Sequence, residues 1–150
     1  MQSPKTIHCE ILTPDGITAS GDYVCVTVPA LDGSMGILAN RAPIAAVVTT
    51  GLVKLRDAND KDTELFVSKG FLRVASNRAT ILAEECCKAT ELDPEKAWDI
   101  LQKAYKMPRD TKAQEAIREE AIAAARIRFS IAQKARKAMG SLADVFSKGL

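Results

Sequence analysis

Apolar and polar side chains alternate in short runs over the first 88 residues, and this period of two constrains the fold most strongly. The runs lie at 7–11, 24–28, 52–55, 65–67, 71–75 and 79–83, with an apolar run at 44–50 that ends at Gly51. Turn signals such as Pro14-Asp15-Gly16, Gly21-Asp22 and Ser68-Lys69-Gly70 separate them. Because many short strands without intervening helices are typical of sandwiches and barrels, the sequence predicts an antiparallel β-sandwich, or flattened barrel, over 1–88.

Helical signals replace the alternation after Thr90. Asp93 is placed to cap a helix, Pro94 suits the first helical position, and Glu95 complements the positive end of the helix dipole. Met107-Pro108 ends this helix, because proline disfavours helical geometry in the residue before it.

A second helix is predicted from Asp110 or Thr111, either of which can cap it, to about Met139, with Gly140 as its end. It is rich in alanine, which favours helix but buries little apolar area against a neighbour. The two helices are expected to form an antiparallel hairpin. We therefore divide the chain into a sandwich domain at 1–88, a helical hairpin at 89–140 and a tail at 141–150.

Composition and charge exclude several classes of function. The formal net charge is +2, with nine basic and ten acidic residues at 1–88 and twelve and nine at 89–150. This mild excess does not indicate a nucleic-acid-binding protein, but it suggests that the C-terminal part meets an acidic surface. The longest uncharged run, 42–53, is shorter than the roughly 20 residues of a spanning helix, so we expect no transmembrane segment.

The cysteine and histidine content argues against an enzyme and against a metal site. His8 is the only histidine, so no catalytic arrangement can be built around a second imidazole. Cys9 and Cys25 lie in alternating runs as small apolar residues, while the adjacent Cys86 and Cys87 lack the spacing of a CxxC site. We therefore expect reduced, structural cysteines, no metal and no catalytic residues.

The segment 33–55, GSMGILANRAPIAAVVTTGLVKL, is the most distinctive one. The glycine turn 33–36 is followed by an apolar run, the corner Asn40-Arg41-Ala42-Pro43 and an apolar strand. By themselves these residues indicate a turn and a tight strand corner, and they do not match a phosphate-binding loop. Their order resembles a signature of the small rotor subunit of F-type ATP synthases, called epsilon in bacteria and chloroplasts and delta in mitochondria. The resemblance covers nearly the whole chain and implies a β-sandwich followed by a two-helix hairpin.

The resemblance also implies contact residues for partner subunits. The rim that would face the c-ring and the γ subunit comprises Ser34, Asn40, Arg41 and Pro43. Arg41 stands where the family has its usual histidine, and Ser34 where some members have glutamate. Because a guanidinium is permanently charged, the basic contact would remain, but any protonation-dependent tuning at this corner would be lost.

A second motif, Leu92–Ala97, resembles the I/L-D-x-x-R-A motif that binds ATP in some bacterial members. The matching positions are Asp93, Lys96, Ala97 and, in the second helix, Arg128. Lysine replaces the motif's arginine, and Ala124 stands where a further arginine is found. Since fewer bidentate donors remain, phosphate affinity is expected to be low. A well-capped helix start explains the same residues, so both interpretations stay open: no cofactor, or a regulatory ATP.

The second helix also carries a basic stretch with no acidic residue between its ends: Arg126, Arg128, Lys134, Arg136 and Lys137. A solvated helix face that complements the negative end of the helix dipole explains it. By the resemblance, this helix is an inhibitory arm that meets an acidic loop of the catalytic β subunit. Both interpretations stay open.

The predicted function is that of a non-catalytic rotor subunit in the central stalk of an F-type ATP synthase. The sandwich would bind γ and the c-ring and couple hydrogen ion or sodium transport to ATP synthesis, and the hairpin would regulate ATP hydrolysis. The N-terminal residues lack the features of a signal or transit peptide, which favours the bacterial epsilon type, peripheral on the cytoplasmic face of the cell membrane. The alternative is a free-standing regulator whose hairpin binds a nucleotide or an acidic partner.

Overall fold

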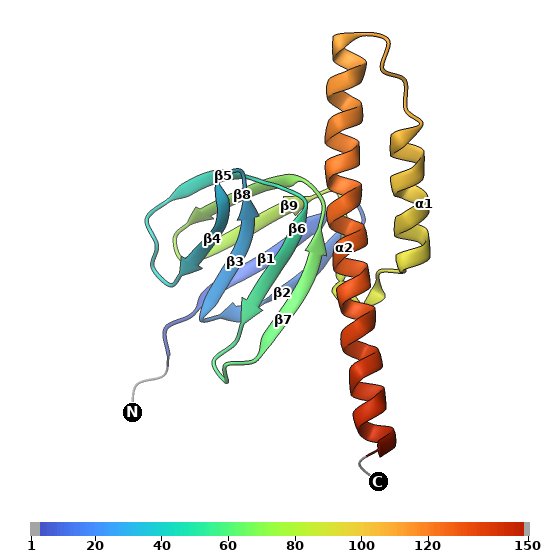
Figure 1. The fold of residues 1–150 in the computed structure, drawn as a ribbon. Coiled ribbons are helices and arrows are strands. Elements are labelled where there is room, and N and C mark those ends of the chain that lie inside the picture. The colour runs from blue at the N-terminus through green and yellow to red at the C-terminus, as the bar shows by residue number, and fades with distance from the viewer. Residues whose placement is uncertain (1–3, 149–150) are drawn as a thin grey trace. The chain divides into compact units, whose positions relative to one another are not determined.

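The computed structural model describes residues 4–148, and their side chains as far as Ser141. The chain divides into two compact units, 1–88 and 89–150 (Figure 1). The first unit contains the strands β1 (Ile7–Thr13), β2 (Gly16–Tyr23), β3 (Cys25–Ala30), β4 (Gly33–Leu38), β5 (Ile44–Val48), β6 (Gly51–Arg56), β7 (Asp62–Val67), β8 (Gly70–Ala75), β9 (Arg78–Ala83) and β10 (Cys86–Lys88). The second contains a 3₁₀ turn (η1, Ala89–Glu91) and the helices α1 (Pro94–Tyr105) and α2 (Lys112–Lys148).

The strands form one hydrogen-bonded path that wraps into a sandwich (Figure 1). Their order is β10-β7-β6-β3-β5-β8-β9-β1-β2, and β4 pairs with β3 beside this path. Among the described strands, β1 and β9 form the one parallel pair, while the other pairs are antiparallel. A sandwich followed by two helices confirms the predicted fold class.

The core of the sandwich consists of the inward-facing set of the alternating runs. Successive side chains of a strand point to opposite faces, so Ile7, Cys9 and Ile11 are buried while His8 and Glu10 lie on the outer face. The same alternation buries Val26, Val28, Val53, Leu55, Leu72, Val74, Ala79 and Ile81. Burial raises the pKa of the Cys9 thiol to about 12, so this cysteine stays a protonated core residue at neutral pH.

The prediction was wrong at three glycine-containing positions of the sandwich. The segment 33–36, predicted as a turn, is the first part of β4, and the turn lies at Leu31-Asp32 instead. Gly21-Asp22, another predicted turn, lies within β2, and Gly51 begins β6 rather than ending the preceding strand. The reason is tertiary pairing: β4 pairs with β3 along its whole length, which overrides the low strand propensity of glycine.

The start of the first helix is as predicted. The Asp93 side chain accepts a hydrogen bond of 3.0 Å from the backbone N–H of Glu95, and Pro94 is the first helical residue. At the second helix, Thr111 provides the cap, because its hydroxyl accepts from the N–H of Gln114 at 3.1 Å. The Gln114 amide oxygen accepts from the Thr111 N–H in return at 3.3 Å, which completes a capping box.

The predicted end of the second helix at Gly140 is wrong, because α2 continues to Lys148. A glycine inside a helix costs only about 1 kcal/mol relative to alanine, and no proline follows Gly140 to prevent continuation. The predicted tail 141–150 is therefore helical up to residue 148, and its last two residues lie outside the described part of the chain.

Within the second unit, a small apolar cluster joins α1 to α2. It consists of Leu101 and Ala104 from α1 and Ile122 and Ala125 from α2. Because two of these four side chains are alanines, the apolar area buried between the helices is modest.

Candidate functional site

Five neighbouring strands carry apolar side chains in matching register on the outer face of the sandwich. Val47 lies opposite Phe71, and Phe71 opposite Leu82. Leu82 lies opposite Leu12, and Leu12 opposite Ile17. We call these five residues the apolar row. Phe71 is 64% exposed and Leu82 52%, so the row presents apolar surface to its surroundings.

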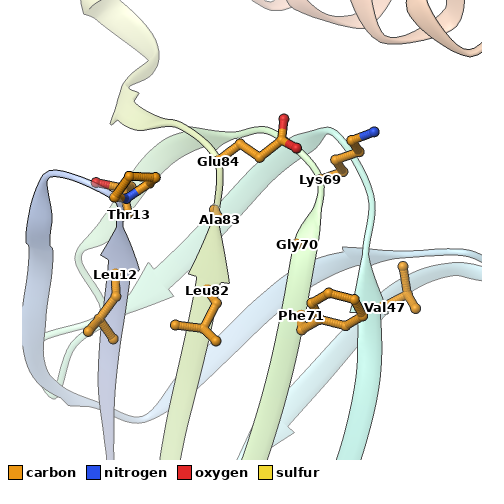
Figure 2. Close-up of a pocket in the computed structure, with 10 residues that line it drawn as sticks. Leu12, Thr13, Val47, Lys69, Gly70, Phe71, Leu82, Ala83 and Glu84 are labelled. Atoms are coloured by element: carbon orange, nitrogen blue, oxygen red, sulfur yellow. The ribbon is translucent and has the colours of Figure 1, made fainter.

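Four residues of the apolar row, all except Ile17, line two shallow depressions. Figure 2 shows Leu12, Leu82, Phe71 and Val47 on adjacent strands below the charged ends of Lys69 and Glu84, in a depression of about 600 Å³. A second depression of about 820 Å³ extends over β5, β8 and β9 and shares Val47, Phe71 and Leu82 with the first. It reaches Pro43, so the structure joins one residue of the predicted rim to the apolar row.

A charged network lies on β9, β1 and β2. The Arg78 guanidinium donates to the Glu10 carboxylate at 3.3 Å, and the two nitrogens of the His8 ring contact Glu10 at 3.2 Å and Asp22 at 2.8 Å. The Ser20 hydroxyl lies 3.4 Å from the His8 ring. Along β1, the outer face therefore changes from charged at His8 and Glu10 to apolar at Leu12.

Hydrogen bonds to Asp22 first and to Glu10 second favour the protonated ring and raise the pKa of His8 above its ordinary value of 6.5. Desolvation and the nearby charge of Arg78 oppose this with smaller effects. A raised pKa means that the folded chain holds this proton more tightly than the unfolded chain. The resulting stabilisation is complete below about pH 6.5 and is lost as the pH rises through the folded pKa.

Replacing His8 with glutamine is therefore expected to reduce the fall in melting temperature of the full-length chain between pH 6 and pH 8. Glutamine keeps a polar side chain at this position but does not titrate. Thermal melts of wild type and His8→Gln at both pH values measure the difference. Identical pH dependence in the two proteins would show that His8 contributes nothing to it.

The four predicted rim residues do not form one compact site. Asn40, Arg41 and Pro43 lie together in the exposed corner between β4 and β5. Ser34 lies near the opposite end of β4, about 13 Å from Leu38 along the strand at roughly 3.3 Å per residue, and Asn40 follows two residues after Leu38. The corner and Ser34 are therefore separate points on the sandwich surface.

Two of the four residues predicted for nucleotide binding, Asp93 and Ala97, have structural roles in the hairpin. The Asp93 carboxylate caps α1 and lies 3.6 Å from the guanidinium of Arg136 in α2. Ala97 is buried, Lys96 is exposed, and Arg128 is half-buried in α2. The ion pair thus links Asp93 to a member of the basic stretch.

The basic stretch is also partly engaged within the hairpin. Arg126 donates to the Tyr105 hydroxyl at 2.7 Å and lies over the Tyr105 ring, 5.7 Å from its centroid. Arg118 donates to the backbone carbonyl of Tyr105 at 3.2 Å, next to the end of α1. Lys134 and Lys137 are exposed. Two of the five predicted arm residues, Arg126 and Arg136, therefore tie α2 to α1.

Sequence reasoning missed the apolar row, although the chain contains a signal for it. In four of the five strands, an outward-facing apolar residue stands next to an inward-facing apolar residue, so the alternation breaks there. The pairs are Ile11-Leu12, Val47-Val48, Phe71-Leu72 and Ile81-Leu82. Strands that are apolar on both faces at one end indicate a surface that is covered on the outside as well.

Comparison with known proteins identifies the family. A family model described as "ATP synthase, Delta/Epsilon chain, beta-sandwich domain" matches residues 6–89, more than half of the chain. The chain belongs to the delta/epsilon family of ATP synthase subunits. The resemblance found in the sequence is thereby confirmed.

Relatives of the delta/epsilon family match beyond the sandwich. The chain is 36% identical to the ATP synthase epsilon chain of Dichelobacter nodosus over 107 residues, which are 71% of this chain and 73% of that one. The chloroplastic epsilon chain of Atropa belladonna is 31% identical over 97 residues, which are 65% of this chain and 72% of that one.

Chains in two solved ATP synthase structures share the fold. A chain of the Euglena gracilis mitochondrial ATP synthase, from an OSCP/F1/c-ring structure, superposes with a TM-score of 0.70 at 20% identity, covering 85% of this chain and 81% of that one. A chain of the Tetrahymena thermophila central stalk and c-ring structure gives 0.70 at 16% identity, covering 87% and 99%.

None of the described helices is long and apolar enough to cross a membrane. Among the side chains that the structure describes, no group of three or more histidine, cysteine or acidic residues is placed to hold a metal ion.

Proposed function

We propose that this chain is a non-catalytic central-stalk subunit of an F-type ATP synthase, of the bacterial epsilon type. Its sandwich binds the γ subunit and the c-ring, and so couples ion passage to rotation and ATP synthesis. Its helical hairpin regulates ATP hydrolysis. In this role the chain is peripheral, on the cytoplasmic face of the cell membrane. Family membership and the central-stalk relatives support the proposal.

The apolar row is the observation that carries the proposal. One aromatic and several aliphatic side chains lie together on one face, and all of them except Leu12 are exposed. This composition is typical of the centre of a protein–protein interface. Fully burying one such side chain contributes about 1.5–3 kcal/mol, so covering Phe71, Leu82 and Val47 together supplies several kcal/mol of binding free energy. We assign this face to the γ subunit.

The exposed corner suits the c-ring. Arg41 is exposed and presents a cationic guanidinium, and Pro43 borders the depression that contains the apolar row. A partner on the corner and a partner on the apolar row would therefore be neighbours. This adjacency fits a subunit that joins γ to the c-ring.

For the hairpin, we propose that the basic stretch meets an acidic loop of the catalytic β subunit. Lys134 and Lys137 are accessible as the hairpin stands. A regulatory ATP would have to compete with Arg136 for the surroundings of Asp93, so any affinity is expected to be low.

Recovery of partners from native membranes tests the proposed function. A tagged full-length chain expressed in its own host is expected to co-purify with the γ subunit and the c-ring. Recovery of neither would contradict the central-stalk proposal and favour a free-standing regulator.

Truncation after Ala89 tests the division of labour. Because the sandwich and the hairpin have separate apolar cores, residues 1–89 are expected to stay folded and to recover γ. Inhibition of ATP hydrolysis in membranes that carry the truncated subunit is expected to change. Circular dichroism, pull-down and ATPase rates are the measurements, and unchanged inhibition would remove the regulatory role of the hairpin.

A further inference from the structure

Asn77 makes an unusual set of contacts at the turn between β8 and β9. Its side-chain oxygen accepts a hydrogen bond of 2.8 Å from the backbone N–H of Asn40. Its side-chain nitrogen donates to the backbone carbonyl of Thr6 at 2.9 Å. Its own backbone carbonyl accepts from the N–H of His8 at 3.3 Å. One half-buried residue thus uses its side-chain acceptor, its side-chain donor and its carbonyl on other segments.

These contacts join segments that are far apart in the chain. Asn40 is 37 residues from Asn77, and Thr6 is 71 residues away. Asn40 begins the exposed corner, and Thr6 comes immediately before β1. The Asn77 side chain is therefore a clamp between the corner and the first strand.

The corner needs such a clamp because the sheet does not hold it. Residues 40–43 lie between β4 and β5, and all four are exposed. Asn40 has a φ of 61°, a left-handed conformation that costs free energy for a residue other than glycine. Since fixing a residue's backbone costs about 1–2 kcal/mol of conformational entropy, a short exposed corner keeps one conformation only if hydrogen bonds hold it.

We propose that Asn77 is the positioning residue of the corner: by holding the Asn40 N–H, it sets where Arg41 and Pro43 stand. It would not itself contact a partner subunit. The inference rests on the proposed function, because the corner matters only if it meets a partner.

Position 77 requires a left-handed backbone conformation and a side chain with both an acceptor and a donor, and asparagine meets both requirements. Its φ is 57°, which asparagine, aspartate and glycine tolerate better than other residues. Aspartate keeps the acceptor for Asn40 but loses the donor to Thr6. Glycine keeps the backbone conformation but loses both side-chain bonds. Comparing Asn77→Asp with Asn77→Gly therefore separates the effect of the hydrogen bond to Asn40 from the effect of the backbone conformation at residue 77.

The first measurement is amide hydrogen exchange of the full-length chain by NMR. In Asn77→Gly, protection of the Asn40 amide is expected to fall at least tenfold, while the amide of Val74 in β8 exchanges as in wild type. In Asn77→Asp, the Asn40 amide is expected to keep its protection. The control is Asn59→Gly, the same change in the turn after β6, which should leave Asn40 unaffected.

The second measurement is binding of the same proteins to a purified γ–c-ring complex. Asn77→Gly is expected to bind at least about tenfold more weakly than wild type, Asn77→Asp less than threefold more weakly, and Asn59→Gly equally well. If Asn77 merely stabilised the fold, Asn77→Gly would melt at a lower temperature than wild type, and Asn77→Asp would not restore the melting temperature.

The two measurements separate failure of this inference from failure of the proposed function. If wild type binds and Asn77→Gly binds equally well, the positioning role is overturned. If the Asn40 amide keeps its protection in Asn77→Gly, the clamp itself is overturned, whatever the binding result. If wild type does not bind the complex, the proposed function fails, and with it the role of Asn77 in docking.

Discussion

Replacing Phe71 with glutamate is expected to weaken binding of the γ subunit at least 100-fold while the sandwich stays folded. Phe71 is 64% exposed in the middle of the apolar row, so its loss leaves the core intact. In a complex, the glutamate would place an unpaired charge at the centre of a desolvated contact. Losing an aromatic anchor and burying that charge costs at least about 3 kcal/mol, or roughly two factors of ten in affinity.

The measurement is titration of full-length Phe71→Glu against purified γ, with a thermal melt to verify folding. Ile117→Glu is the matched control, because Ile117 is 57% exposed in α2, outside the sandwich, and its replacement should leave affinity for γ unchanged. Phe71→Gln adds a neutral comparison and is expected to fall between wild type and glutamate. If Phe71→Glu bound γ with wild-type affinity, the apolar row would not be part of the γ interface.

Replacing Gly70 with alanine is expected to destabilise the sandwich by at least about 3 kcal/mol. A Cβ atom at Gly70 would overlap the carbonyl oxygen of Leu82 and lie 2.9 Å from the Cα of Ala83. Both obstacles are backbone atoms of β9, which a side-chain rotation cannot move away. The strands β8 and β9 would have to separate at the place where they carry Phe71 and Leu82.

A loss of this size corresponds to a fall in melting temperature of at least about 12 °C for a unit of this length. Gly36→Ala is the matched control, since a Cβ at Gly36 in β4 would meet no atom within 4 Å. Its melting temperature should stay within a few degrees of wild type. Equal melting temperatures for Gly70→Ala and Gly36→Ala would show that the β9 backbone at Leu82 can move aside at little cost in stability.

The inner face of the sandwich and the start of the first helix could be predicted from the sequence because both depend on local patterns. Alternation alone identified Ile7, Cys9 and Ile11 as core residues, and the Asp93-Pro94 pair identified the cap. The strand β4 and the continuation of α2 through Gly140 could not be predicted in this way. Glycine is a local signal for a turn or a helix end, but strand pairing at β4 and good helix formers around Gly140 outweigh it.

The candidate site could be predicted only in part, for a related reason. The corner at Asn40–Pro43 is contiguous in sequence and is distinctive there. The apolar row requires knowledge of register, because Leu12 and Leu82 become neighbours only through the pairing of β1 with β9. The role of Asn77 depends on contacts with Thr6 and Asn40, which no spacing rule connects.

The parallel pair of β1 and β9 has a consequence for the order of folding. Glu10 and Arg78, which meet across this pair, are 68 residues apart in the chain. During synthesis, β1 emerges from the ribosome first, yet its partner β9 is complete only after residue 83 has been added. The sandwich thus has a high contact order and closes late, whereas the helical hairpin folds through local contacts. Until then, β1 can pair only with its sequence neighbour β2, and its apolar residues lack the neighbours that β9 supplies.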